Sequence, residues 1–336
     1  MATKLLFPPT LYTALKDQKN PESFQSIRPF SFLPTNYWSC SNPNFRSICS
    51  VNSASIRGVK QDVIQSSDSE TETIIGSNSS STASSKLVLV VGGSGGVGQI
   101  VVASLLSRDI KVRLLLRDPE KATKLFGKQD EEKLQVFKGD TRNQEDLDPS
   151  ILEGVTHVIC CTGTTAFPSR RWDGDNTPER VDWDGLRNLI SILPSTLKRF
   201  VLVSSIGVTK FDELPWNIMN LFGVLKYKKK GEDFLRDSGI PYTIIRAGRL
   251  TDGPYTSYDL NTLLRATAGE RRAVLLGQGD KLVGEVSRLV VAEACIQSLD
   301  IESTKGEIFE INSVKGDGPS SDPQKWKELF DAARTK

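Results

Sequence analysis

A run of glycines in the first third of the chain has the spacing of a phosphate-binding loop. It directly follows the apolar stretch 86–91 and opens a helical pattern, which is the context that such a loop requires. Both GxxGxxG and GxGxxG are satisfied by the run Gly92, Gly93, Ser94, Gly95, Gly96, Val97 and Gly98. Glycines permit a tight turn and a close approach to pyrophosphate, and the N–H groups that begin the helix attract its charge. We therefore expect these seven residues to bind a dinucleotide.

The second apolar stretch ends in Arg117 rather than in an acidic residue. An acid at this point binds both ribose hydroxyls of NAD, whereas a guanidinium suits a 2′-phosphate. Lys121, one helical turn later, is placed to assist. The alternative for Arg117 is a solvated position in a loop. The sequence therefore favours NADP(H) as the cofactor.

Asp140 and Thr141 follow the third apolar stretch, where a fold of this kind places the adenine. We count both among the cofactor-binding residues. Asp140 either accepts a hydrogen bond from the adenine amino group or caps a turn, and the sequence leaves both roles open.

Strand and helix patterns alternate along the chain from residue 86 onward. The expected strands cover residues 86–91, 110–116, 134–138, 155–161, 200–204 and 242–246. The expected helices cover residues 96–107, a short turn after Pro119, 144–152 and 177–193, with one more that ends near Ser238-Gly239. This rhythm predicts an α/β fold with a doubly wound parallel sheet in a single domain, residues 86–336. Ligands of such sheets bind at the carboxyl ends of the strands.

The N-terminal part differs in composition. Residues 1–60 hold nine serines and seven Lys or Arg but only two acids. A Ser-rich, basic and acid-poor segment without periodicity is typical of an organellar transit peptide, and the serine excess favours a plastid. An N-terminal tail that carries no address is the alternative. We expect a chloroplast transit peptide over residues 1–52 and a disordered Ser/Thr-rich linker over residues 53–85.

Composition excludes several functions. The 43 Lys and Arg nearly balance the 41 Asp and Glu, so we expect no nucleic-acid partner. No apolar run approaches about 18 residues, so we expect no transmembrane segment. Five cysteines without a CxxC pair and a single histidine make a metal site unexpected.

The chain resembles the atypical short-chain dehydrogenase/reductases of the NmrA-like, NAD(P)H-binding type. Among them it is most similar to plant chloroplast Rossmann-fold and sanguinarine-reductase-like proteins. The resemblance covers residues 86–314 and rests on VVGGSGGVGQ at 90–99, KGDTRN at 138–143, ERVDWDGLRNLI at 179–190, VLVSSIGV at 201–208, KKKGEDFLRDSGIPYTIIRAGRL at 228–250 and SRLVVAEACIQSL at 287–299. These motifs are specific to the superfamily and not to a substrate.

The resemblance implies a reductase site built on Ser, Tyr and Lys. Ser205 matches the catalytic serine, and Lys228 matches the lysine that also binds ribose. Cofactor contacts are implied for Ser204, Thr162 and Gly163.

The tyrosine of that site is missing from its usual place. Its position falls on Val224, which cannot donate a proton, and Tyr227 is followed four residues later by Gly231 rather than by lysine.

Three functions remain open. The first is an NADPH-dependent plastid reductase whose small-molecule acceptor, of the quinone, flavin or iminium type, needs little more than hydride. The second is a non-catalytic NADP(H)-binding redox sensor or assembly factor with a plastid protein partner. The third is an isomerase or epimerase. The expected location is the chloroplast stroma, with peripheral association with thylakoid or envelope left open.

Two loops are expected to form the walls of a substrate cleft. The first spans residues 162–176 and carries Phe167 and Trp172, and the second carries Trp216 and Phe222. Surface packing is an equal alternative for the aromatic residues of the first loop.

Overall fold

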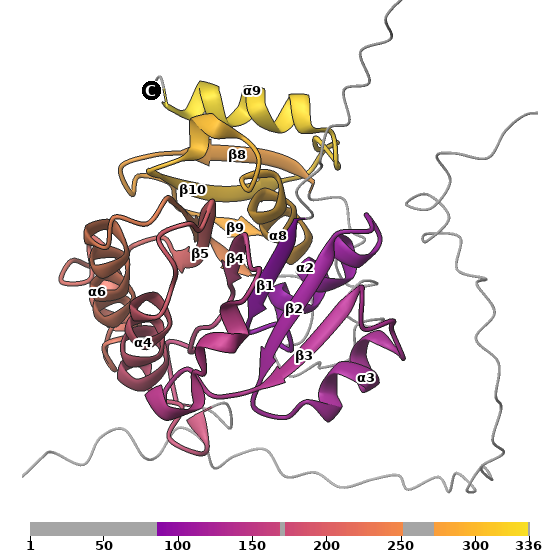
Figure 1. The fold of residues 1–336 in the computed structure, drawn as a ribbon. Coiled ribbons are helices and arrows are strands. Elements are labelled where there is room, and N and C mark those ends of the chain that lie inside the picture. The colour runs from indigo at the N-terminus through magenta and orange to yellow at the C-terminus, as the bar shows by residue number, and fades with distance from the viewer. Residues whose placement is uncertain (1–85, 169–171, 251–271, 335–336) are drawn as a thin grey trace, which may run out of the picture. The chain divides into compact units, whose positions relative to one another are not determined.

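The computed structural model describes residues 86–168, 172–250 and 272–334. The expected transit peptide and linker lie outside these residues. The described part contains an eight-stranded sheet in the order β3-β2-β1-β4-β5-β6-β10-β8 (Figure 1). The strands are β1 (Leu87–Val91), β2 (Lys111–Leu116), β3 (Leu134–Lys138), β4 (His157–Cys160), β5 (Arg199–Ser205), β6 (Tyr242–Ala247), β8 (Ala273–Gly277) and β10 (Glu307–Val314).

All neighbouring strands of the sheet are parallel except the β10–β8 pair. The chain order turns back between β1 and β4, and this reversal is the switch point at which doubly wound sheets bind ligands. The predicted parallel α/β sheet is confirmed. Its extension by β10 and β8, and the two-stranded pairing of β7 (Arg249–Leu250) with β9 (Glu285–Val286), were not predicted.

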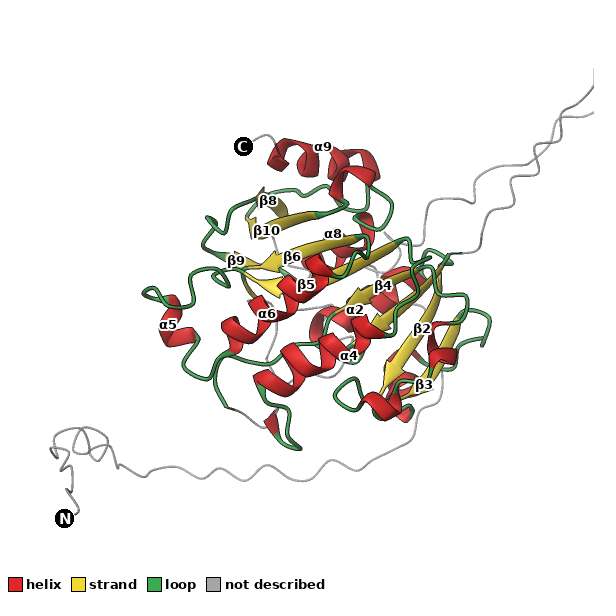
Figure 2. Ribbon diagram, turned by 60° about the vertical axis from the view of Figure 1, so that its left-hand side comes forward, coloured by secondary structure: helices red, strands yellow, loops and turns green. Residues whose placement is uncertain are grey.

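Helices cover both faces of the sheet (Figures 1 and 2). One face packs on α2 (Gly96–Leu106), α3 (Glu120–Phe126) and α8 (Arg288–Gln297), and the other packs on α4 (Gly185–Ser191) and α6 (Val224–Asp237). Alternate β1 residues enter the two cores: Val88 and Val90 one of them, and Leu89 and Val91 the other. Burial on both faces explains why this strand is continuously apolar.

Most predicted helix positions agree with the structure. The helix that ends at Asp237 is followed by Ser238 and by Gly239 with φ +75°, as expected for a glycine at a helix end. The C-terminal helix α9 (Pro323–Arg334) is amphipathic and buries Trp326 and Phe330. The Phe330 ring lies 4.8 Å from that of Phe309 in β10, so this helix covers the sheet extension.

Two predicted helices need correction. The segment 144–152 forms two 3₁₀ turns, η1 (Gln144–Asp146) and η2 (Pro149–Leu152). Pro149 holds Asp148 in an extended conformation with ψ 133°, which prevents a continuous helix. The helix expected over 177–193 begins as a π-helical turn, η4 (Glu179–Asp184), and becomes α-helical only at Gly185. Such turns occur frequently at functional sites.

Candidate nucleotide and substrate site

The glycine loop joins the end of β1 to the start of α2. Gly92 has φ +81°, and a Cβ there would lie 2.8 Å from the backbone of Cys161 and Thr162 at the end of β4. A Cβ on Gly98 would lie 2.2 Å from the Gly92 carbonyl oxygen. Only glycine fits these two positions, so the loop is held tightly across the switch point.

The first turn of α2 is suited to an anion. It contains no acidic residue, and its N-cap, Gly95, offers no side chain to the free N–H groups. The Gln99 amide donates to the Ser94 carbonyl (2.8 Å), so Gln99 supports the loop from within. The N–H groups that point out of this turn can therefore receive a phosphate.

A buried arginine from a distant segment supports the same loop. Arg288, the first residue of α8, is 4% exposed, and its Nε lies 2.8 Å from the point where a Cβ on Gly96 would stand. The motif SRLVVAEA was noted in the sequence, but its arginine was not identified as a residue of the site. Arg288 brings a positive charge to the phosphate-binding turn.

The residues expected at the adenosine end lie at the carboxyl ends of β2 and β3. Arg117 is exposed, and its Nη1 donates to Asn176 Oδ1 (2.6 Å). Lys121 Nζ lies 3.9 Å from an Asp118 carboxylate oxygen. The guanidinium of Arg117 is therefore hydrogen-bonded to a neutral side chain at the carboxyl end of β2.

Asp140 is engaged by its own turn. The Arg142 guanidinium donates to both of its carboxylate oxygens, and the shortest contact is 2.6 Å. Burial raises the pKa of Asp140, but the hydrogen bonds from Arg142 outweigh it, and the net shift is downward. The neighbouring Thr141 accepts a hydrogen bond from Asn188 Nδ2 at its carbonyl (3.0 Å). This geometry favours the turn-capping role of Asp140 over an adenine contact.

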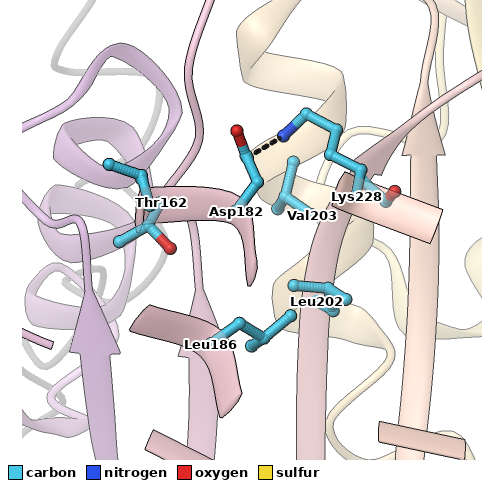
Figure 3. Close-up of a pocket in the computed structure, with 8 residues that line it drawn as sticks. Thr162, Asp182, Leu186, Leu202, Val203 and Lys228 are labelled. Atoms are coloured by element: carbon cyan, nitrogen blue, oxygen red, sulfur yellow. Dashed lines mark hydrogen bonds and ion pairs between the residues drawn. The ribbon is translucent and has the colours of Figure 1, made fainter. Parts of the chain in front are cut away.

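A buried ion pair occupies the other side of the switch point (Figure 3). Lys228 Nζ donates to Asp182 Oδ1 (2.6 Å), and these side chains are 13% and 2% exposed. The second oxygen of Asp182 accepts hydrogen bonds from the backbone and hydroxyl groups of Thr164. Asp182 thus fixes Lys228 and ties α6 to η4 and to the loop after β4.

This ion pair lines a pocket at the carboxyl ends of β4 and β5. Its other lining residues are Thr162, Val181, Leu186, Leu202, Val203 and Ser204. A Cβ on Gly163 would lie 2.8 Å from Lys228 Nζ, so this glycine leaves room for the ammonium group. Sequence reasoning placed Lys228, Thr162, Gly163 and Ser204 here but missed Asp182, although it lies in the quoted motif ERVDWDGLRNLI.

The two serines at the end of β5 are placed differently. Ser204 lines the pocket, is 7% exposed, and its hydroxyl has no hydrogen-bond partner. Ser205 donates its hydroxyl to the Ile206 carbonyl (3.0 Å) and is not among the residues that line the pocket. Successive strand residues point to opposite faces. Of the two serines, Ser204 therefore lies at the pocket, while the catalytic role that the resemblance implies for Ser205 stays a prediction.

Val224 lies one helical turn before Lys228, in the register expected from the sequence. It is buried in a small cluster with Val208 and Leu225. Tyr227 is half-buried and does not line the pocket, and its pKa is raised by burial and by Glu179. The described residues therefore place no tyrosine hydroxyl at the pocket.

The two loops expected to form cleft walls meet through aromatic contacts. The Phe222 ring lies 5.6 Å from Trp172 and 6.4 Å from Phe167, both edge to face. Trp172 Nε1 also donates to Thr165 Oγ1 (3.1 Å). The expected walls of the cleft are thus in direct contact with each other.

Two further side chains near the pocket are structural. Arg246 in β6 forms a buried ion pair with Glu232 in α6 (2.6 Å), which anchors the helix that carries Lys228. Arg249 pairs with Glu285 at the surface.

Among the described residues, no cluster of His, Cys, Asp and Glu could hold a metal. Within those same residues, no helix is long and apolar enough to cross a membrane.

A glycine loop at the switch point of a doubly wound sheet places the chain among the Rossmann-fold nucleotide-binding proteins. The model of the family described as NAD(P)H-binding matches residues 92–302. The chain belongs to this family, and the resemblance to atypical short-chain dehydrogenase/reductases is confirmed. The residues present fit a nicotinamide dinucleotide, because the first turn of α2 has no side-chain cap and no acidic residue, so its free N–H groups can bind a pyrophosphate.

Known proteins similar to the chain include chloroplastic ones. An uncharacterized chloroplastic protein of Arabidopsis thaliana is 32% identical over 74% of this chain and 76% of its own length. Sanguinarine reductase of Eschscholzia californica is 32% identical over 74% of this chain and 96% of its own. The photosystem II assembly factor Ycf39 of Trieres chinensis is 31% identical over 68% of this chain and 64% of its own.

Solved structures support the fold. The oxidoreductase ylbE of Lactococcus lactis matches with a TM-score of 0.55 over 74% of this chain and 97% of its own, at 17% identity. At this identity the match establishes the fold alone.

Proposed function

We propose that the protein is an NADP(H)-dependent plastid reductase that transfers hydride to a small conjugated acceptor of the quinone, flavin or iminium type. One observation carries the proposal: the Lys228 ammonium and the unpartnered Ser204 hydroxyl line one pocket beside the glycine loop. Polar groups that converge at the switch point of a dinucleotide fold are suited to hold the reacting end of a cofactor and its acceptor.

The residues of the chain have separable tasks. The first turn of α2 and Arg288 hold the pyrophosphate, and Lys228, fixed by Asp182, holds the ribose hydroxyls. When bound, the nicotinamide supplies a hydride. Ser204 donates its free hydroxyl to the acceptor, while Ser205 supports the strand end.

The missing tyrosine limits the acceptor. Val224 offers no proton, and a simple ketone needs a proton as its alkoxide forms. Quinones, flavins and iminium ions accept hydride without that coupled proton. Such acceptors therefore suit this site better than ketones do.

The preference for NADP(H) rests on Arg117. Its guanidinium stands at the end of β2, where an acid would select NAD. Lys121, one turn later, adds a second positive charge to this end of the site.

The plastid location has two supports. The chloroplastic relatives support it, and so does the acid-poor, Ser-rich composition of the segment proposed as a transit peptide, residues 1–52. Fusion of these residues to a fluorescent reporter tests the proposal. Plastid fluorescence is expected, and purely cytosolic fluorescence would contradict it.

The reductase proposal is tested with the purified full-length chain. NADPH binding is measured by calorimetry, and NADPH oxidation is then followed with a tailless quinone, a flavin, an iminium ion and a simple ketone. We expect oxidation with at least one of the first three acceptors and little with the ketone. Lys228→Met should weaken NADPH binding, whereas Lys226→Met, an exposed lysine of the same helix, should not. NADPH binding without oxidation by any acceptor would contradict a reductase.

A non-catalytic redox sensor or assembly factor is the second candidate. It is favoured by the apolar packing of Val224 in the place of the usual proton donor. It predicts capture of a plastid protein that depends on whether NADP⁺ or NADPH is present. Capture that is independent of the cofactor, together with turnover of an acceptor, would argue against it.

A further inference from the structure

Exposed apolar side chains concentrate in the loop after β4 and in the segment that precedes α6. Ten large apolar side chains are exposed in the described residues, and six of them lie on two adjoining loops. We call these six the apolar ledge: Phe167, Leu214, Ile218, Met219, Leu221 and Phe222. Leu214 and Leu221 are 75% and 70% exposed, and clusters of exposed apolar side chains often mark binding sites.

The apolar ledge adjoins, along the chain, the segments that carry Lys228 and the partner of Asp182. Phe222 directly precedes Gly223, the N-cap of the helix that carries Lys228, and its ring contacts Phe167. Phe167 lies three residues after Thr164, which bonds Asp182. The short helix α5 (Trp216–Met219), which carries part of the ledge, stands at the edge of the described domain (Figure 2).

The backbone of the ledge is held in place. Asn220 Oδ1 accepts hydrogen bonds from the backbone N–H groups of Leu225 and Lys226 (3.0 and 3.1 Å). Trp216 packs against the cluster of Val208, Val224 and Leu225. The apolar side chains therefore face solvent, while Asn220 and Trp216 anchor the segment that carries them.

The part of the ledge that precedes α6 is uncharged along the chain. The ten residues from Leu214 to Gly223, LPWNIMNLFG, contain no acidic or basic side chain. Two acids, Asp212 and Glu213, precede them, and the first lysine after them is Lys226. This segment offers no charged partner to a phosphate group, but it can remove an aliphatic chain from water.

We propose that the apolar ledge binds the aliphatic chain of a quinone whose conjugated head lies at the mouth of the Lys228–Asp182 pocket. This inference rests on the proposed reductase function and selects among its acceptors. Flavin nucleotides carry a phosphate on their side chain, and iminium ions carry a charge and need no long chain. In the reaction, NADPH gives a hydride to the quinone and becomes NADP⁺, and the hydroquinone anion takes one proton from water.

The test uses the full-length chain and benzoquinones that share one head but carry no chain, a five-carbon chain or a ten-carbon chain. Binding is measured by quenching of tryptophan fluorescence with NADP⁺ present, and turnover is measured by NADPH oxidation. We expect the ten-carbon quinone to bind at least about tenfold more tightly than the tailless one, because the ledge buries several methylene groups.

Variants locate the effect. The double variant Ile218→Asn, Leu221→Asn should remove most of the chain-length dependence and leave binding of the tailless quinone unchanged. Leu275→Asn is the matched control, since Leu275 is 45% exposed on β8, away from the ledge. Circular dichroism and NADP⁺ binding confirm that the variants are folded.

The outcomes separate the two proposals. Equal binding of all quinones, or equal loss in Leu275→Asn, would overturn the ledge proposal. So would ledge-dependent binding to neutral lipid vesicles without a chain-length effect, which would make the ledge a membrane contact. Chain-dependent binding without NADPH oxidation would keep the ledge proposal and contradict only the reductase function.

Discussion

The two sides of the site are built in different ways. The nucleotide side is made by backbone atoms of seven consecutive residues, and its shape depends on the absence of side chains at Gly92 and Gly98. The pocket side is made by Asp182 and Lys228, which are 46 positions apart and meet through an ion pair. The first side depends on local conformation and the second on tertiary packing. A substitution should therefore affect them through different measurable quantities.

The largest effect is expected when only one partner of the Lys228–Asp182 ion pair is removed. Lys228→Met leaves the Asp182 carboxylate buried without its partner, which costs about 3–5 kcal/mol of unfolding free energy. Urea denaturation measures this loss. The double variant Asp182→Asn, Lys228→Met removes both charges and should recover most of it. A double variant as unstable as Lys228→Met would show that the pair is not the cause.

The glycine loop should respond in affinity. Gly98→Ala places a methyl group against the Gly92 carbonyl, so the loop must open and misplace its N–H groups. We expect NADPH binding to weaken about a hundredfold, or by about 2.7 kcal/mol. Gly127→Ala is a stability control, because that glycine has φ +71° but lies outside the loop. Unchanged affinity in Gly98→Ala would contradict the role of the loop.

His157 in β4 belongs to neither side of the site, and its titration links the stability of the fold to pH. Burial lowers the pKa of His157 from 6.5 to about 4 in the folded protein. Between these values the unfolded chain binds the proton more readily, so the stability is present above pH 6.5 and is lost as the pH falls toward 4. The unfolding free energy should drop by about 2 kcal/mol between pH 7.5 and pH 5 through this group. His157→Gln should lose that part of the pH dependence, and an unchanged profile would refute the assignment.

The smallest effect concerns cofactor choice. Arg117→Asp should reverse the preference for NADPH over NADH, with a change of about tenfold, or about 1.4 kcal/mol. Calorimetric titration with both cofactors measures it. Asn176→Ala, which removes the hydrogen-bond partner of Arg117, should weaken the preference only slightly. Equal affinity of the unaltered protein for both cofactors would refute the role of Arg117.

The turn formed by the glycine loop and the helical position of Lys228 could be predicted from the sequence because their signals are local. The glycine spacing, the apolar run of β1 and the position of Lys228 on its helix all concern residues close together in the chain. Asp182 could not be found this way, because its partner is contributed by another helix and a π-helical turn sets its direction. Arg288 was not identified from the sequence for the same reason, since only the packing of α8 on α2 brings it to Gly96.

Successive side chains of β5 point to opposite faces of the sheet, so the two adjacent serines have different surroundings. The motif alone does not show this difference. Ser204 faces the pocket, whereas the hydroxyl of Ser205 is bonded to the neighbouring carbonyl. The strands β8 and β10 were not predicted. For the residues after β6, the interpretation relied on the family resemblance and not on the pattern of apolar residues.

The π-helical turn η4 makes the pocket sensitive to chain length as well as to residue type. A π-helical turn holds one residue more than an α-helical turn, so it amounts to an insertion in an ordinary helix. Deleting one residue from it would restore α-helical geometry and rotate Asp182 by about 100° relative to α4. The carboxylate would then leave Lys228 although no residue of the pocket had been replaced. The gain or loss of a single codon could thus separate family members that keep this charge pair from those that do not.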